Sequence, residues 1–437
     1  GKGMKEHWQT GFRWISILMI LSLIITPMTV LAETSDPSLQ LEAKAAILID
    51  ADTGQILYQH NADELRPPAS MTKMMTEYLV MDAIKSGKTD WDNVVTITER
   101  AGSIGGSGQL IAPGQRYTVR DLFRMMSIYS GNDASVALAE HISTSEEKFV
   151  EEMNRKAKEI GLSEGAYFVN ATGLENEHYG NWAPDTEGRT LISAKDAAIL
   201  AQNLIKDHPD LLEFTSTPQA RRIEGDESTE LMNNWNWMLE AWIPLDNIFS
   251  KQYAYEGLDG LKTGYTSDAG YCFTGTAVRD DMRLISVVMG TESEPKRFQE
   301  TAKLRDYGFN NFEKRTILTA KSELDSLKTV PIKKGKEKEL SVVTESGVSL
   351  VVRKNTTAED ISIEPIPLEP DELVAPIEQG QKVGVVKVSY AGPTGEETIN
   401  VNLIAAEDMD KGSWIRLLFR SIGSFFSNIF SSINNIF

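Results

Sequence analysis

The sequence is poor in cysteine and in positive charge. Cys272 is the single cysteine among 437 residues, so no intramolecular disulfide can form and the fold must depend on packed cores. Its neighbours Tyr271 and Phe273 are apolar, which favours a buried structural position over a nucleophile. The chain has 44 Lys and Arg against 63 Asp and Glu, a formal net charge of -19. Because a polyanion would be repelled at long range, we expect no nucleic-acid partner.

Catalytic histidine motifs are missing as well. The chain has no G-x-S-x-G sequence, and its histidines stand in no motif context, which argues against a Ser-His-Asp hydrolase. We expect neither a metal nor a cofactor. What remains is an ordinary composition, 41% hydrophobic and 24% charged. At about 150 residues per domain, the length suggests two or three domains.

The N-terminus carries the pattern of an export signal. Lysines and an arginine precede an apolar stretch at 14–31, and small or β-branched residues end it at Ala32. Serine, threonine and proline interrupt this stretch, so its continuous apolar run is short for a retained transmembrane anchor, the alternative interpretation. We therefore expect residues 1–32 to be a cleaved signal peptide and the mature protein to act outside the cytoplasm.

Strand and helix signals alternate over residues 38–313. Apolar runs at 45–49 and 56–58 flank an Asp-Thr-Gly turn and predict a hairpin. Two prolines then precede a helix that opens near Ser70. Further helices are predicted at 119–127, 133–142, 147–160 and 194–205, strands at 261–278 and 283–289, and a long loop at 170–185. Helices framed by strands indicate an α+β domain.

Two segments of different character follow. Residues 317–406 contain short β-branched runs between Lys, Gly and Pro turns, which predicts a small, mostly-β domain. In residues 410–437, large apolar residues recur at helical spacing opposite serines and asparagines. We expect an amphipathic helix that attaches to the outer face of the cell membrane. A helix docked on its own protein is the alternative.

The candidate chemistry begins at Ser70 and Lys73, which form an S-x-x-K sequence. Residues three apart share one face of a helix, and the positive helix end favours an oxyanion over an ammonium ion. Ser145 and Ser293 begin the same pattern, but in charged surroundings. Only Ser70 opens an apolar helix after a proline stop. A plain N-cap serine is the alternative role for Ser70.

Two further motifs follow in order. Ser130 and Asn132 form an S-x-N sequence just before a predicted helix, and Lys262, Thr263 and Gly264 form a K-T-G sequence that begins a strand-like run. Each pattern also occurs elsewhere in the chain. Chance poorly explains one ordered set inside one domain with every motif at an element boundary.

This motif set resembles that of penicillin-binding proteins and serine β-lactamases. Residues 38–405 are similar to a D-alanyl-D-alanine carboxypeptidase of the low-molecular-weight penicillin-binding protein family, and segments 170–174 and 259–264 look like that subfamily. The resemblance implies a penicillin-binding-protein/β-lactamase-like α+β catalytic domain, a small mostly-β domain and a C-terminal amphipathic helix. It also implies a peptidoglycan stem peptide ending in D-Ala-D-Ala as substrate, and β-lactams as inhibitors.

Residue roles follow from the same resemblance. Ser70 resembles the family's nucleophile, Lys73 its general base and Ser130 the proton shuttle to the leaving amine. Asn132 is similar to the donor to the substrate backbone. A peptide ending in D-alanine presents a carboxylate, a scissile amide and a leaving amine, which such a set of groups suits.

The carboxylate and the oxyanion have their own candidates. Lys262 and Thr263, in the motif that Gly264 completes, resemble the groups that hold the terminal carboxylate. The backbone amides of Tyr265 and of the nucleophile are similar in position to the oxyanion hole. Arg297 is a further candidate for the carboxylate, with a surface arginine as the alternative.

Two other functions remain open at this point. A serine β-lactamase would use a glutamate to activate the deacylating water, and Glu177 loosely fits an E-x-x-x-N pattern. Gly180 stands where an apolar residue is expected, which weakens that fit. The non-enzymatic alternative is a penicillin-binding envelope protein without turnover, against which the intact motifs argue.

Overall fold

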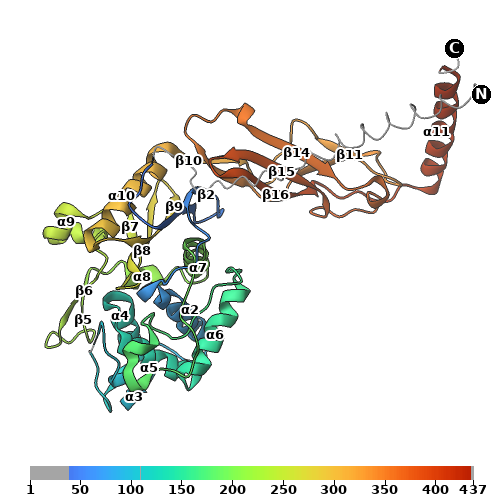
Figure 1. Cartoon of the computed structure of the whole chain (residues 1–437). Helices are drawn as coiled ribbons and strands as arrows, with labels where there is room; N and C mark the ends of the chain where they lie inside the picture. The colour runs from blue at the N-terminus through green and yellow to red at the C-terminus, as the bar shows by residue number, and fades with distance from the viewer. Residues whose placement is uncertain (1–38, 109, 435–437) are drawn as a thin grey trace, which may run out of the picture. The chain divides into compact units, whose positions relative to one another are not determined.

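The computed structural model describes residues 39–108 and 110–434, so the expected signal peptide lies outside the described residues. A central sheet has five antiparallel strands in the order β2-β1-β9-β8-β7 (Figure 1). The strands are β1 (Ala45–Asp50), β2 (Ile56–His60), β7 (Leu258–Thr266), β8 (Gly270–Arg279) and β9 (Met282–Thr291). The predicted β1–β2 hairpin is confirmed. The strand-like region expected at 261–278 forms two strands, β7 and β8, with a turn at 267–269 between them.

Both faces of this sheet are buried. Successive side chains point to opposite faces, so the odd-numbered residues of β1 join one core while Ala46 and Leu48 join the other. Helix α7 (Ala194–Asp207) packs on the first face and α10 (Glu294–Asn311) on the second. Cys272 lies fully buried in β8, as expected, and burial raises the pKa of its thiol.

The helices on the side of α7 carry the first two motifs. Together with α7 they are α2 (Lys73–Lys85), α3 (Glu99–Gly102), α4 (Val119–Tyr129), α5 (Asn132–Ser143), α6 (Glu146–Glu159) and α8 (Leu211–Thr215), with 3-10 turns η1 (Ala69–Thr72) and η2 (Asn176–Trp182). Two short ladders pair β3 (Val94–Thr96) with β4 (Arg116–Thr118) and β5 (Gln219–Arg221) with β6 (Leu231–Asn233). The four helices predicted beyond Ser70 are confirmed with ends within two residues, and the loop expected at 170–185 contains η2.

Helix α10 was not predicted from the sequence. Its start has ordinary signals, since Ser293 Oγ accepts the Lys296 N–H at 3.2 Å and a proline stands in the first turn. Its buried side includes Arg297, Glu300 and Arg305, however, so polar residues interrupt the apolar period that reveals a helix. Before β7, the 3-10 turn η3 (Glu240–Leu245) and α9 (Ile248–Gln252) pack near α10 in the second core.

The mostly-β segment predicted after this domain is confirmed. A ladder pairs β10 (Phe312–Leu318) with β13 (Val348–Arg353), and a second antiparallel sheet has the order β11-β12-β16-β15-β14. Its strands are β11 (Thr329–Pro331), β12 (Glu339–Thr344), β14 (Ile361–Pro367), β15 (Lys382–Gly392) and β16 (Gly395–Ala405), with 3-10 turns η4 (Ala358–Asp360) and η5 (Pro370–Glu372). Valines and leucines on their inner faces form a core of their own.

The tail is helical, as predicted, over α11 (Trp414–Asn434). Its large apolar side chains are exposed, among them Phe419, Phe425 and Phe430. The guanidinium groups of Arg416 and Arg420 donate to backbone carbonyls at Gly335 and Lys336, at 2.7 to 2.9 Å. In the part of the chain that the structure describes, no helix combines the length and apolar character needed to cross a membrane.

Candidate active site

Ser70 and Lys73 meet as their spacing predicts. Ser70 lies in η1 and Lys73 begins α2, and Lys73 Nζ is 2.9 Å from Ser70 Oγ. The residue at the N-cap of this segment is Pro68, so Ser70 is not a helix cap.

The serines of the two other S-x-x-K patterns are helix N-caps, the alternative role considered for Ser70. Ser145 caps α6 and Ser293 caps α10, each accepting the backbone N–H of the lysine three residues on. A capping hydroxyl is held against the backbone, so these two serines are structural. Ser70 differs from both, because Pro68 stands at the N-cap of its segment.

Ser130 occupies the junction between α4 and α5. Its backbone is left-handed, with φ of 61°, a conformation that costs a residue with a side chain roughly 1–3 kcal/mol unless its surroundings enforce it. Ser107 supplies that enforcement: its Oγ donates to the Ser130 carbonyl at 2.6 Å, and its carbonyl accepts the Asn132 N–H at 2.9 Å. The turn therefore holds the Ser130 side chain in one direction.

That direction places the Ser130 hydroxyl between two amines. Lys73 Nζ and Lys262 Nζ each lie 3.0 Å from Ser130 Oγ, and all three groups are buried. Lys73 Nζ also donates to Asn132 Oδ1 at 2.6 Å. The first serine, the S-x-N motif and the K-T-G lysine thus form one hydrogen-bonded cluster.

The cluster sets the charge of Lys73. Burial without solvent and the nearby Lys262 ammonium hold the pKa of Lys73 well below its usual value, against the opposing pull of Asp133 and Glu77. The lowered pKa favours the neutral amine, which can accept a proton at 2.9 Å from Ser70 Oγ.

Strand β7 brings the K-T-G motif against the nucleophile. A Cβ on Gly264 would lie 2.7 Å from the Pro68 carbonyl oxygen and 3.0 Å from the amide nitrogen of Ser70, so only glycine allows this approach. The amide of Tyr265 follows directly. Its ring is half exposed and stacks on Tyr271, with centroids 4.1 Å apart.

A cavity of about 350 Å³ opens over this cluster. Its lining residues are Ser70, Gly106, Ser107, Ser130, Asn132, Gly173, Leu174, Trp235, Thr263, Gly264, Tyr265, Thr266, Tyr271, Glu294 and Arg297. Arg297 is buried rather than on the surface, and it donates to the Gly264 carbonyl and pairs with Glu294, both at 3.3 Å. Asn132 Nδ2 donates to the Gly105 carbonyl at 3.0 Å, so one of its two amide hydrogens is already engaged.

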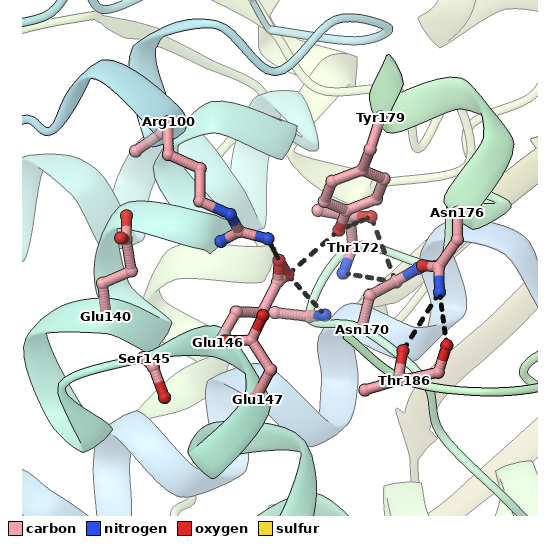
Figure 2. Close-up of polar contacts among 12 residues, drawn as sticks. Arg100, Glu140, Ser145, Glu146, Glu147, Asn170, Thr172, Asn176, Tyr179 and Thr186 are labelled. Atoms are coloured by element: carbon pink, nitrogen blue, oxygen red, sulfur yellow. Dashed lines mark hydrogen bonds and ion pairs between the residues drawn. The ribbon is translucent and has the colours of Figure 1, made fainter. Parts of the chain in front are cut away.

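One wall of the cavity is held by a buried polar network (Figure 2). Glu146 accepts from Arg100 at 2.8 Å and from the Tyr179 hydroxyl at 3.2 Å, and that hydroxyl lies 2.7 Å from Thr172 Oγ1. The network therefore ties Arg100, which precedes Gly106 and Ser107 in the chain, to Thr172, which precedes Gly173 and Leu174.

Asn170 shapes the second wall. Its Oδ1 accepts the backbone N–H of Gly173 at 2.8 Å, and its Nδ2 donates to the Leu174 carbonyl at 2.6 Å and to Asn176 at 2.9 Å. These bonds fold the chain so that Gly173, with φ of 87°, lies against the carbonyl of Ala69 beside the nucleophile.

Several lining residues were missed in the sequence. Ser107 and Trp235 belong to no motif, and no local signal connects them to Ser130, whereas Leu174 ends the segment 170–174 that resembles the subfamily. Trp235 is held in place because its Nε1–H donates to the Tyr129 carbonyl at 3.0 Å and its ring lies against that of Tyr129.

The residue considered for a β-lactamase reaction lies elsewhere. Glu177 is exposed and does not line the cavity, so no deacylating role is indicated for it. Among the described residues no group of three His, Cys, Asp or Glu side chains is placed to hold a metal ion.

Known proteins are similar to this chain in sequence and in architecture. Residues 31–293 match the family model described as D-alanyl-D-alanine carboxypeptidase, and residues 312–411 match that of the penicillin-binding protein 5 C-terminal domain. D-alanyl-D-alanine carboxypeptidase DacF of Bacillus subtilis (strain 168) is 37% identical, over 87% of this chain and 90% of its own. The crystal structure of a peptidoglycan synthesis regulatory factor (PBP3) from Streptococcus pneumoniae has a TM-score of 0.70 and 31% identity, over 85% of this chain and 100% of that one. Penicillin-binding protein D2 from Listeria monocytogenes, in the ampicillin-bound form, has a TM-score of 0.50 and 33% identity, over 62% of this chain and 100% of that one.

Proposed function

The chain belongs to the D-alanyl-D-alanine carboxypeptidase family, and from this premise we propose that Ser70 is its nucleophile and Lys73 the base. The substrate is a peptidoglycan stem peptide ending in D-Ala-D-Ala, from which the enzyme removes the terminal D-alanine. One observation carries the assignment: Ser70, Ser130 and the two lysines form a single hydrogen-bonded cluster, and both serines line the cavity.

Acylation follows from that geometry. Lys73 Nζ accepts the Ser70 hydroxyl proton across 2.9 Å while Ser70 Oγ forms a bond to the carbonyl carbon of the penultimate residue. The amides of Ser70 and Tyr265 stabilise the oxyanion. Collapse breaks the C–N bond, and the proton passes from Lys73 through Ser130 Oγ to the leaving amine.

The remaining roles concern the substrate's terminal carboxylate and the second half-reaction. Thr263 and Arg297 line the cavity, and together with Lys262 they supply a hydroxyl and positive charge for the carboxylate of the leaving D-alanine. After D-alanine leaves, Lys73 is neutral again and takes a proton from the water as the water oxygen bonds to the ester carbon. Lys73 then returns this proton to Ser70 Oγ as the bond between Oγ and the acyl carbon breaks. A β-lactam acylates Ser70 by the same first step, in keeping with the ampicillin-bound relative.

Release of D-alanine tests this proposal. The purified enzyme is incubated with a peptide ending in D-Ala-D-Ala, and free D-alanine is measured alongside mapping of the penicillin adduct by mass spectrometry. We expect turnover and an adduct on Ser70, with both lost in Ser70→Ala and retained in Ser145→Ala. An adduct on Ser145 or Ser293 would refute the nucleophile. Labelling of Ser70 without D-alanine release would instead indicate a penicillin-binding protein that does not turn over.

The chain organisation is part of the same proposal. Residues 1–32 are a cleaved signal peptide, 38–313 the catalytic domain, 317–406 the mostly-β domain and 410–437 a helix attached to the outer face of the cell membrane. The exposed phenylalanines and isoleucines of α11 support the attachment, since each large apolar side chain that becomes fully buried contributes roughly 1.5–3 kcal/mol.

Truncation tests the attachment. A chain that ends before Asp410 should stay active and no longer sediment with anionic liposomes, whereas the full chain should bind them. Sedimentation of the truncated enzyme with the liposomes would rule out α11 as the anchor.

A further inference from the structure

Glu77 is a buried acid that the mechanism above leaves unused. It lies on α2 one turn after Lys73, its side chain is fully buried, and neither carboxylate oxygen has a hydrogen-bond partner among the described residues. Two other buried glutamates are paired, Glu146 with Arg100 and Glu300 with Lys303, and the buried Asp133 accepts backbone N–H groups instead. Burial of an unpaired polar group is costly, so packing alone gives no reason for a glutamate here.

The position of Glu77 relates it to both lysines of the active site. Residues four apart lie on one face of a helix, so Glu77 shares a face of α2 with Lys73. Lys262 is close to Lys73 as well, because both amines contact the Ser130 hydroxyl. Two buried ammonium ions this close repel each other strongly. A carboxylate next to them compensates for one positive charge and leaves the other lysine free to lose its proton.

Burial lowers the pKa of both lysines, and Glu77 opposes this lowering most directly at Lys262. Burial lowers the pKa of Lys262, Glu77 is the carboxylate that raises it, and Arg297 lowers it further. For Lys73, burial and Lys262 lower the pKa, while Asp133 and then Glu77 raise it. Burial raises the pKa of Glu77, while Lys262 and, less strongly, Lys73 lower it. Its charge therefore acts mainly on Lys262 and secondarily on Lys73.

We propose that Glu77 is a positioning residue that determines where the positive charge of the active site lies. Its carboxylate keeps Lys262 an ammonium ion while Lys73 remains a neutral amine. This rests on the proposed function, in which Lys262 binds the substrate carboxylate and Lys73 is the base. It adds a residue outside the three motifs that decides which of two buried lysines holds the proton.

The pH profile of Glu77→Gln distinguishes this role from a structural one. Without the carboxylate both lysines lose their protons at lower pH. The acidic limb of kcat/KM, which needs neutral Lys73, and the alkaline limb, which needs charged Lys262, should both move to lower pH. For a buried charge several ångströms away we expect a shift on the order of one pH unit. The variant should then lose about tenfold in relative kcat/KM on the alkaline side.

Companion variants separate charge from folding. Glu77→Asp keeps the charge and should restore the limbs to the wild-type position. Glu77→Met removes the charge without leaving a buried polar group, and should show the same shift as glutamine even if Glu77→Gln is unstable. Glu300→Gln removes a buried, paired acid and should leave the limbs in place, whatever it does to thermal stability.

The outcomes are distinguishable from failure of the proposed function. If the wild type releases D-alanine normally but Glu77→Gln and Glu77→Met change only the height of the profile, Glu77 is structural and this inference is overturned. If the wild type releases no D-alanine and Ser70 takes no penicillin, the proposed function itself fails.

Discussion

Substitution of Gly173 by alanine tests how closely the cavity wall must approach the nucleophile. A Cβ at this position would lie 1.8 Å from the Ala69 carbonyl oxygen, whereas such contacts are essentially never shorter than 3.0 Å. The two segments must therefore separate by about 1.2 Å. Since Ala69 directly precedes Ser70 and is itself left-handed, with φ of 51°, the shift would be transmitted to the nucleophile.

The structure supplies a matched control at Gly188. Both glycines are left-handed, with φ of 87° and 83°, so alanine costs roughly 1–2 kcal/mol of backbone strain at either. A Cβ on Gly188 meets only Tyr167, at 3.9 Å, and therefore causes no collision. The difference between the two variants isolates the overlap with Ala69 from the strain of the backbone.

Acylation by benzylpenicillin, followed by stopped flow, measures the effect. A misplacement near 1 Å can reduce a rate about 100-fold, so Gly173→Ala should acylate at least that much more slowly. Gly188→Ala should acylate at the wild-type rate and lose only the strain energy in urea unfolding. If Gly173→Ala acylated within threefold of wild type, the wall would be free to move and the reasoning would be wrong.

Three further results are expected. Lys73→Arg should lose acylation by 100-fold or more, on the order of removing a general base, because guanidinium cannot give up its proton; near-normal rates would show another base. Glu177→Gln should change neither acylation nor deacylation, since Glu177 lies outside the cavity, and a trapped penicilloyl enzyme would contradict this. Cys272 should resist a coloured thiol reagent in the native enzyme and react after denaturation, because it is fully buried and its pKa is raised; stoichiometric native labelling would disprove that burial.

Helices whose apolar residues recur with a clear helical period were predictable from the sequence. Helices that bury charged residues among the apolar ones were not. The helix at 147–160 has a charged face and an apolar face, and α6 matches it closely. Helix α10 buries Arg297 and Arg305 among its apolar residues, so the pattern that marks a helix is hidden.

The sequence by itself determined the contact between Ser70 and Lys73, because three residues of helical chain bring one side chain to the other whatever packs around them. Only the tertiary structure decided that the Ser130 hydroxyl lies between Lys73 and Lys262, since that requires α2, the α4–α5 junction and β7 to meet. It alone revealed that the carboxylate of Glu77 is buried without a hydrogen-bond partner among the described residues, because burial depends on distant segments that close over a residue and no spacing rule records them.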